Sequence, residues 1–232
     1  MRRPFIEPNV PFQENFLEIY EELTKYYSEI VVTINNRNDL KEATKKLREL
    51  KNISYRYHIV PTRISDTKVL LRKIRFKVDL ISIFPNSKNL AAFSARDRRI
   101  DILVFDSTNF NLFTTSIAKL AKENEKILEI NFGDIIRTPH GTAKVSKLGR
   151  YRALSQRAIE ENVKLIFTMS PVSKYDIKSP RELGALGELL DIPPKIIIDG
   201  ISKIIKERIE LNRRKRSGEY ILPDVRIIKK ED

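Results

Sequence analysis

Residues 179–190 have the composition of a helix start that can hold an anion. Ser179 is a favoured N-cap, Pro180 suits the first helical position, and Glu182 completes a capping box. Arg181 lies in the first turn, where unpaired backbone N–H groups and the helix dipole already favour negative charge. A well-capped amphipathic helix is the simpler interpretation of this pattern. The chemistry that it could perform is the binding of a phosphate group by Arg181.

The residue types needed for metal or acid–base catalysis are scarce. The chain has two histidines, His58 and His140, and neither has a histidine or carboxylate at the spacing of metal ligands. It has no cysteine, and none of its seven glycines forms a phosphate-binding fingerprint after a strand. We therefore predict no catalytic residue, no metal ligand and no cofactor bound by this chain. The alternative is a stand-alone metal-dependent phosphoesterase that uses strand-end carboxylates such as Asp106 and Glu129.

The net charge is the strongest feature of the composition. The chain has 44 lysines and arginines against 31 aspartates and glutamates, a net charge of +13, and its pI is about 9.8. Such an excess favours a polyanionic partner, because binding to phosphates releases counterions. We predict a nucleic acid, and a scaffold whose basic face binds an acidic protein is a further alternative. No apolar run reaches the roughly 18 residues of a membrane span, so we expect a cytoplasmic protein without membrane contact.

Apolar runs and amphipathic segments alternate along the chain, which is typical of a parallel sheet with helical crossovers. Strands are expected at residues 5–10, 29–34, 55–60, 78–83, 100–105, 127–132 and 164–169. Helices are expected at residues 14–27, 39–50, 66–74, 87–96, 112–123, 144–161, 179–190 and 196–211, with a loop at 133–141. We predict an α/β fold, a TIM-barrel-like parallel β/α barrel of about seven strands surrounded by helices. An open doubly wound sheet is the competing arrangement.

The carboxyl ends of barrel strands carry the loops that usually bind ligands. Six basic residues follow predicted strands and are expected to bind nucleic acid on that one face: Arg37, Arg137, His140, Lys144, Lys178 and Arg181. We expect a single β/α-barrel domain over residues 1–212. Residues 213–232, which begin with four consecutive basic residues, are predicted to form a basic, flexible tail that acts as an electrostatic arm.

Residues 175–187 resemble the signature region of the thirty-kilodalton ribonuclease P subunit family, whose archaeal form is ribonuclease P protein component 3. In this chain the segment reads Tyr-Asp-Ile-Lys-Ser-Pro-Arg-Glu-Leu-Gly-Ala-Leu-Gly. Four further segments are similar to the family, at residues 9–12, 78–82, 100–103 and 118–124. The resemblance covers about residues 5–212, and the segment around Arg181 is its most specific part.

The resemblance implies a barrel related to amidohydrolase and phosphoesterase barrels but without their metal centre. It implies a non-catalytic, RNA-binding subunit that assists the catalytic RNA of ribonuclease P in removing the 5′ leader of precursor tRNA, with magnesium held by the RNA. The implied partners are ribonuclease P RNA, precursor tRNA, component 2 in a heterotetramer, and other ribonuclease P proteins. The resemblance also implies RNA contacts for Arg181, for the basic pair Arg75 and Lys77, and for Lys122.

Overall fold

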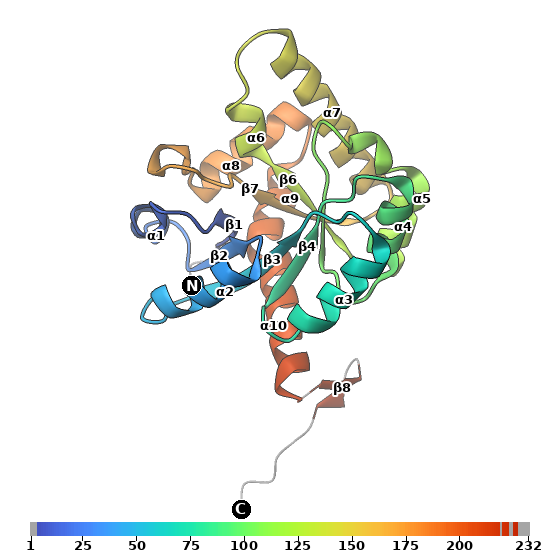
Figure 1. Cartoon of the computed structure of the whole chain (residues 1–232). Coiled ribbons are helices and arrows are strands. Elements are labelled where there is room, and N and C mark those ends of the chain that lie inside the picture. The colour runs from blue at the N-terminus through green and yellow to red at the C-terminus, as the bar shows by residue number, and fades with distance from the viewer. Residues whose placement is uncertain (1–3, 219, 223–224, 227–232) are drawn as a thin grey trace, which may run out of the picture.

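The computed structural model describes residues 4–218, 220–222 and 225–226 of the chain. Seven parallel strands form one sheet in the order of the sequence, which curves into a nearly closed barrel (Figure 1). The strands are β1 (Ile6–Pro11), β2 (Glu29–Ile34), β3 (Ile53–Ile59), β4 (Leu80–Ile83), β5 (Ile102–Val104), β6 (Ile127–Asn131) and β7 (Lys164–Thr168). Each predicted strand is present, and the predicted TIM-barrel-like β/α fold is confirmed.

Helices connect the strands and surround the barrel. Between the strands lie α1 (Phe16–Leu23), α2 (Arg37–Lys46), α3 (Ile64–Ile74), α4 (Lys88–Arg96), η1 (Phe110–Leu112), α5 (Thr115–Glu123), α6 (Phe132–Ile136) and α7 (Thr142–Glu160). After β7 come η2 (Lys174–Asp176), α8 (Pro180–Leu186), η3 (Gly187–Leu190), α9 (Pro194–Asp199), a π-helical turn η4 (Gly200–Ile204) and α10 (Ile205–Ser217). A short antiparallel pair, β8 (Tyr220–Leu222) and β9 (Val225–Arg226), follows α10.

One predicted loop is partly helical. Residues 133–141 were expected to be a loop, but α6 occupies the first half of that segment. The side chain of Asn131 caps this helix by accepting a hydrogen bond from the backbone N–H of Asp134 at 3.2 Å. The short helix turns the chain directly at the end of β6, so that α7 begins beyond the rim of the barrel.

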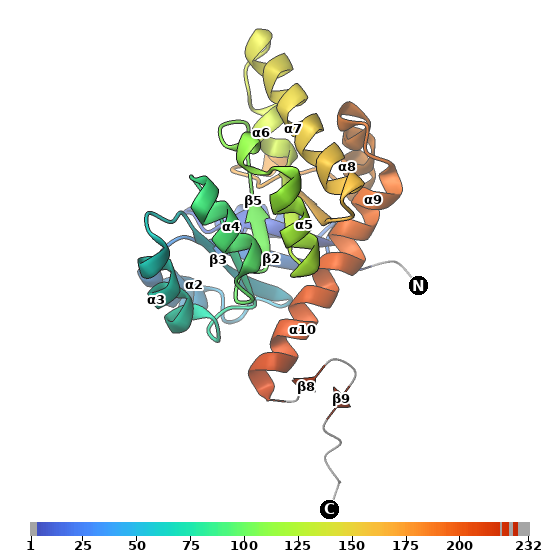
Figure 2. The same ribbon diagram turned by 90° about the vertical axis from the view of Figure 1, so that its right-hand side faces the viewer.

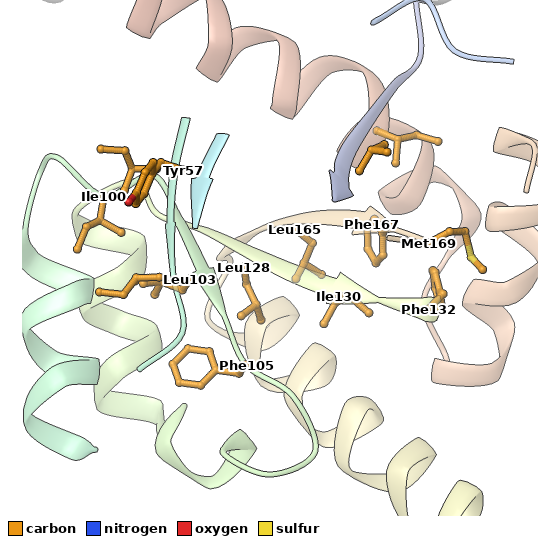
Figure 3. Packing of buried hydrophobic residues seen from close by; sticks show 14 of the residues in the cluster. Tyr57, Ile100, Leu103, Phe105, Leu128, Ile130, Phe132, Leu165, Phe167 and Met169 are labelled. Carbon is orange, nitrogen blue, oxygen red and sulfur yellow. The ribbon is translucent and has the colours of Figure 1, made fainter. Parts of the chain in front are cut away.

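The outward side chains of the strands pack against the helices and form the larger hydrophobic core. Leu128 of β6 lies opposite Leu165 of β7, and Ile130 lies opposite Phe167 (Figure 3). Phe132, which begins α6, stacks on Phe167 with ring centroids 5.9 Å apart. These contacts come from the period-two alternation of the strands, which sends every second side chain outward.

The C-terminal helix closes the barrel at the amino ends of the strands. A separate buried cluster inside the barrel contains Ile6, Val31, Leu80, Ile102, Ile127 and Ile166 from the strands, and Ile205 and Ile209 from α10. The turn η4 lies against β7, where a Cβ on Gly200 would stand 2.7 Å from the backbone oxygen of Leu165. Only glycine permits this close approach, so Gly200 lets the helix enter the barrel end.

Helix α10 extends past the predicted domain end at residue 212, because its basic side chains pair with carboxylates at the strand starts. Arg213 donates to Glu29 at 2.9 Å and to Asp79 at 3.2 Å, and Arg216 donates to Asp79 at 3.0 Å. The prediction that residues 213–216 belong to a flexible electrostatic arm is therefore wrong. The other predicted tail residues at 219, 223–224 and 227–232 lie outside the described residues.

Candidate nucleic-acid interface

Nearer the carboxyl ends of the strands, beyond the buried cluster that contains Ile205 and Ile209, the interior of the barrel is polar. Arg56 of β3 and Glu129 of β6 form an ion pair with both side chains fully buried. Arg56 also donates to Ser82 Oγ at 2.7 Å and to the backbone oxygen of Pro8 at 3.2 Å. Asn9 donates to the other oxygen of Glu129 at 2.9 Å. These side chains point inward because they alternate along their strands with the outward core residues.

Burial neutralises two further groups in this interior. Burial raises the pKa of Glu7 to about 8, an effect larger than the opposing hydrogen bonds from Thr168 and the backbone N–H of Asn9. Burial and the positive charge of Arg56 lower the pKa of His58 to about 3. The Nδ1 atom of His58 lies 2.9 Å from Ser82 Oγ, as expected for a core histidine with a hydrogen-bond partner. Both groups are therefore uncharged near neutral pH.

A cavity of about 340 Å³ opens at the carboxyl ends of the strands. Its lining includes Asp106 and Glu129, the carboxylates considered for a metal-dependent hydrolase. Glu129 is paired with Arg56, and Asp106 closes its own turn by accepting from the backbone N–H and hydroxyl of Thr108, both at 2.6 Å. Among the described residues, no group of three or more histidine or acidic side chains could hold a metal ion.

Four of the predicted basic residues lie at the carboxyl ends of the strands, as expected: Arg37, Arg137, His140 and Lys144. We call residues 137–150 the α6–α7 arm; it includes the first half of α7, which projects away from the barrel (Figures 1 and 2). Most of the arm is exposed, and Val145 is 70% exposed. Lys144 Nζ donates to the backbone oxygen of Ile136 at 3.1 Å, which fixes its ammonium group at the base of the arm.

Lys178 and Arg181 do not share that face. Tyr27, which precedes β2, donates its hydroxyl to the backbone oxygen of Lys178 at 2.8 Å. Arg181 lines a surface groove with Phe5 and Ser28, which precede β1 and β2. The prediction of one common face is therefore wrong for these two residues, because the chain after β7 turns back along the flank of the barrel.

The local prediction around Arg181 agrees with the structure. Ser179 Oγ accepts from the backbone N–H of Glu182 at 3.3 Å, and Glu182 accepts from the backbone N–H of Ser179 at 2.7 Å, which completes the capping box. The Arg181 side chain is exposed and makes no hydrogen bond or ion pair with any described residue. Its charge is free to bind an anion in solution.

Arg75, Lys77 and Lys122 lie at the amino ends of the strands, so the structure separates them from the arm. Arg75 is tied to the buried carboxylate of Asp101 at 3.0 Å. Lys77 and Lys122 are exposed, and neither has a hydrogen-bond or ion-pair partner among the described residues. The basic pair inferred from the resemblance thus contains one structural cation and one free cation.

The sequence prediction omitted an adjacent group of cations on α3. Lys68, Arg72 and Lys73 are exposed on this helix, close in sequence to Lys77. The signal was available, because the stretch 63–77 contains six basic residues and one acidic residue, Asp66. These side chains extend the basic surface along the outside of the barrel.

The fold and the site define a class of protein: a β/α barrel with a buried ion pair, Arg56–Glu129, in its polar interior and cationic groups in separate places on its exterior. A family model described as RNase P subunit p30 matches residues 7–217. The chain belongs to this ribonuclease P subunit family.

Several curated relatives support the assignment. Ribonuclease P protein component 3 of Natronomonas pharaonis is 27% identical over 158 residues, which span 68% of this chain and 65% of that protein. The same component of Haloarcula marismortui is 22% identical over 64% of this chain and 62% of that protein. The Methanosarcina barkeri component is 22% identical over 96% of this chain and 94% of that protein.

Solved structures share the fold. A chain of the cryo-EM structure of archaeal ribonuclease P with mature tRNA has a TM-score of 0.78 at 19% identity, and the match covers 98% of this chain and 99% of that one. Histidinol phosphate phosphatase of Lactococcus lactis has a TM-score of 0.55 at 9% identity, over 86% of this chain and 97% of that one. At these identities the likeness establishes the barrel architecture alone.

Proposed function

We propose that this chain is an RNA-binding protein subunit of ribonuclease P, which assists a catalytic RNA in removing the 5′ leader of precursor tRNA. The observation that carries the proposal is the match of the family model to residues 7–217. The net charge of +13 supports a polyanionic partner. No helix in the described part of the chain has the length and apolar character that crossing a membrane requires, and we expect the complex in the cytoplasm.

The proposed RNA contacts fall into three groups. The first group, at the carboxyl ends of the strands, is Arg37, Arg137, His140 and Lys144. The second, on the flank of the barrel, is Lys178 and Arg181. The third, at the amino ends of the strands, is Lys77 and Lys122. Arg75 is retained as a weaker member, because its guanidinium is engaged with Asp101. Folded RNA offers phosphates and 2′-hydroxyls over a wide surface, so separate cationic groups can contact one molecule.

The chemical step is assigned to the RNA, with magnesium ions bound by the RNA. The chain itself contributes binding energy and orientation, because the buried charges of its interior, Arg56 and Glu129, are paired with each other. The proposed protein partners are component 2, in a heterotetramer, and the other proteins of the ribonuclease P complex. We expect precursor tRNA to contact the assembled complex.

The experiment is a binding titration of ribonuclease P RNA with the full chain, followed by a precursor tRNA cleavage assay in the reconstituted complex. Replacing both arm residues in a His140→Ala/Lys144→Ala variant should weaken RNA binding by about tenfold or more, because two contacts to phosphate are lost. Lys51→Ala removes an exposed lysine outside the three groups and should leave the affinity unchanged.

Two results would overturn the proposal. RNA affinity that is measurable but independent of salt would favour a protein scaffold that binds an acidic partner. Cleavage of precursor tRNA by the protein without RNA, with loss of activity in Glu129→Gln, would favour the stand-alone hydrolase.

A further inference from the structure

The cavity at the carboxyl ends of the strands has aromatic walls. Phe12, Phe84 and Phe105 line it, and the first two are partly exposed at its rim. Its volume of about 340 Å³ lies at the lower end of the range for small-molecule pockets. Aromatic rings at a rim offer flat apolar faces on which another planar group can stack. The walls therefore suit a flat ligand of modest size.

Thr33 presents an unpaired hydroxyl to this cavity. Its side chain is 9% exposed, and Oγ1 is buried without a hydrogen-bond partner among the described residues. Thr33 lies two positions after Val31, whose side chain belongs to the interior cluster, so both residues face the inside of the barrel. Because a buried hydroxyl without a partner is unfavourable, Thr33 Oγ1 is available to a hydrogen-bonding group that enters the cavity.

The hydrogen bonds around Ser82 favour one tautomer of His58. Arg56 Nε donates to Ser82 Oγ, and His58 Nδ1 lies 2.9 Å from the same oxygen. The serine hydrogen has no other acceptor among the described residues, so we assign it to the hydrogen bond with Nδ1. The neutral ring then carries its own hydrogen on Nε2, and this N–H has no partner in the described part of the chain.

The remaining polar lining supplies acceptors on its carboxylates and donors on Arg137 and the asparagine amides. Asp106 uses Oδ1 for Thr108, and its Oδ2 has no partner among the described residues. Four carboxylates line the cavity, those of Asp106, Asp39, Glu129 and Asp134, against the single guanidinium of Arg137, and this excess of negative charge disfavours a phosphate or another anion. The guanidinium and ammonium groups of a protein partner carry no acceptor, so they would leave the His58 N–H unpaired. A ligand with both donors and acceptors on a flat edge satisfies both sets of groups.

We propose that the mouth of the barrel binds a single unpaired nucleobase of RNA, stacked on the phenylalanine rim and hydrogen-bonded to Thr33 and His58. This inference rests on the proposed RNA-binding function and assigns a second kind of contact to it. The basic groups on the exterior would bind phosphates without regard to sequence, whereas the mouth would select an unstacked base. Single-stranded loops and bulges of RNA offer such bases.

The two histidines provide a direct readout, because the imidazole signals of His58 and His140 are readily assigned by nitrogen-15 NMR in a chain with only these two. The probes are guanosine, adenosine, cytidine and uridine, compared with ribose, inorganic phosphate and N-acetyl-argininamide. At least one nucleoside should shift the His58 signals and leave His140 unmoved, whereas ribose should shift neither. Shifts of His58 with argininamide and with no nucleoside would overturn the proposal in favour of a protein segment, and shifts with phosphate alone would overturn it in favour of an anion site.

A valine substitution separates a ligand contact from a packing defect. Thr33→Val keeps the side-chain shape and should leave stability unchanged or raised, since the lost hydroxyl has no partner. It should weaken nucleoside binding about 2- to 12-fold, which corresponds to one neutral hydrogen bond. The matched control, Thr62→Val, makes the same change at an exposed threonine outside the cavity lining and should alter neither quantity.

The two proposals fail in different ways. If the wild-type chain binds ribonuclease P RNA with steep salt dependence but no nucleoside moves His58, the base pocket is wrong and the RNA-binding function stands. If the chain binds nucleosides but no structured RNA, the proposed function is wrong. Equal nucleoside affinity for Thr33→Val and the wild type would also overturn the base pocket.

Discussion

Asn212 of the C-terminal helix donates to the carboxylate of Asp101 at 3.0 Å and to the backbone oxygen of Asp79 at 2.8 Å. Asn212 and Asp101 are buried, and they are 111 positions apart in the sequence. Asp101 directly precedes β5, and the bond therefore joins α10 to the amino end of the barrel. The last long helix is consequently part of the barrel's packing, although its sequence has the strongly basic composition of a solvent-exposed arm.

Asn212→Ala should destabilise the fold by roughly 1–3 kcal/mol, because two buried acceptors lose their donor. The measurement is the free energy of unfolding in urea. Arg214→Ala is the control, since this side chain has no ion pair among the described residues, and it should change stability by less than about 0.5 kcal/mol. Equal stability of both variants would show that α10 does not depend on this contact.

The buried carboxyl of Glu7 should make stability fall as pH rises. The folded chain keeps this proton up to a pKa of about 8, whereas the unfolded chain releases it near 4.5. Between these values the unfolded state binds fewer protons, so the free energy of unfolding decreases with pH. Between pH 6.5 and 8 the slope from this group reaches at most about 1.4 kcal/mol per pH unit. His58 has the opposite slope, because its pKa is about 3 in the fold and 6.5 ordinarily, and its contribution fades from pH 6.5 toward pH 8.

Glu7→Gln tests this directly, because the amide cannot titrate. Its stability should vary less with pH than that of the wild type between pH 6.5 and 8, and its advantage over the wild type should grow toward pH 8. Urea unfolding at four pH values within this window provides the comparison. Parallel pH profiles for the two proteins would mean that Glu7 is already ionised in the fold.

Local patterns predicted most of the fold. The seven apolar runs became the seven strands, because each run is flanked by an amphipathic segment that needs a sheet to cover. Two of the details that were missed have a clear physical cause. The helix α6 begins at a strand end that reads as a loop, and α10 continues through residues 213–217 because distant carboxylates neutralise its arginines. Contacts with such long sequence separation leave no periodic signal along the chain.

The candidate site was less predictable than the fold. Residues that follow a predicted strand were expected at the carboxyl end of the barrel, and Arg37, Arg137, His140 and Lys144 do lie there. This expectation failed for Arg181, because the segment after β7 is long enough to turn back along the flank. The unpaired hydroxyl of Thr33 also escaped notice, since only the three-dimensional structure shows which threonine lacks a partner.

The pair Arg75 and Lys77 should separate into a structural and a functional residue. Arg75→Ala removes a partner of the buried Asp101 and should lower stability by roughly 1–3 kcal/mol. Lys77→Ala should leave stability within about 0.5 kcal/mol and reduce the slope of log affinity against log salt by about 0.7–0.9 if it contacts one phosphate. Urea unfolding and RNA titrations at several salt concentrations measure both effects, and an unchanged slope for Lys77→Ala removes this lysine from the interface.

At the capped start of α8, Arg181 should matter for RNA binding and Ser179 for stability. Arg181→Ala should leave stability within about 0.5 kcal/mol, because the side chain is exposed, and should lower RNA affinity by roughly 1–3 kcal/mol. Ser179→Ala should cost roughly 1 kcal/mol of stability, because it removes the cap, with a smaller effect on RNA. Arg181→Lys should recover part of the binding, since lysine keeps the charge without the planar fork. Thermal unfolding and RNA titration of all three variants decide the matter: early unfolding of Arg181→Ala with normal RNA affinity would exclude Arg181 from the interface.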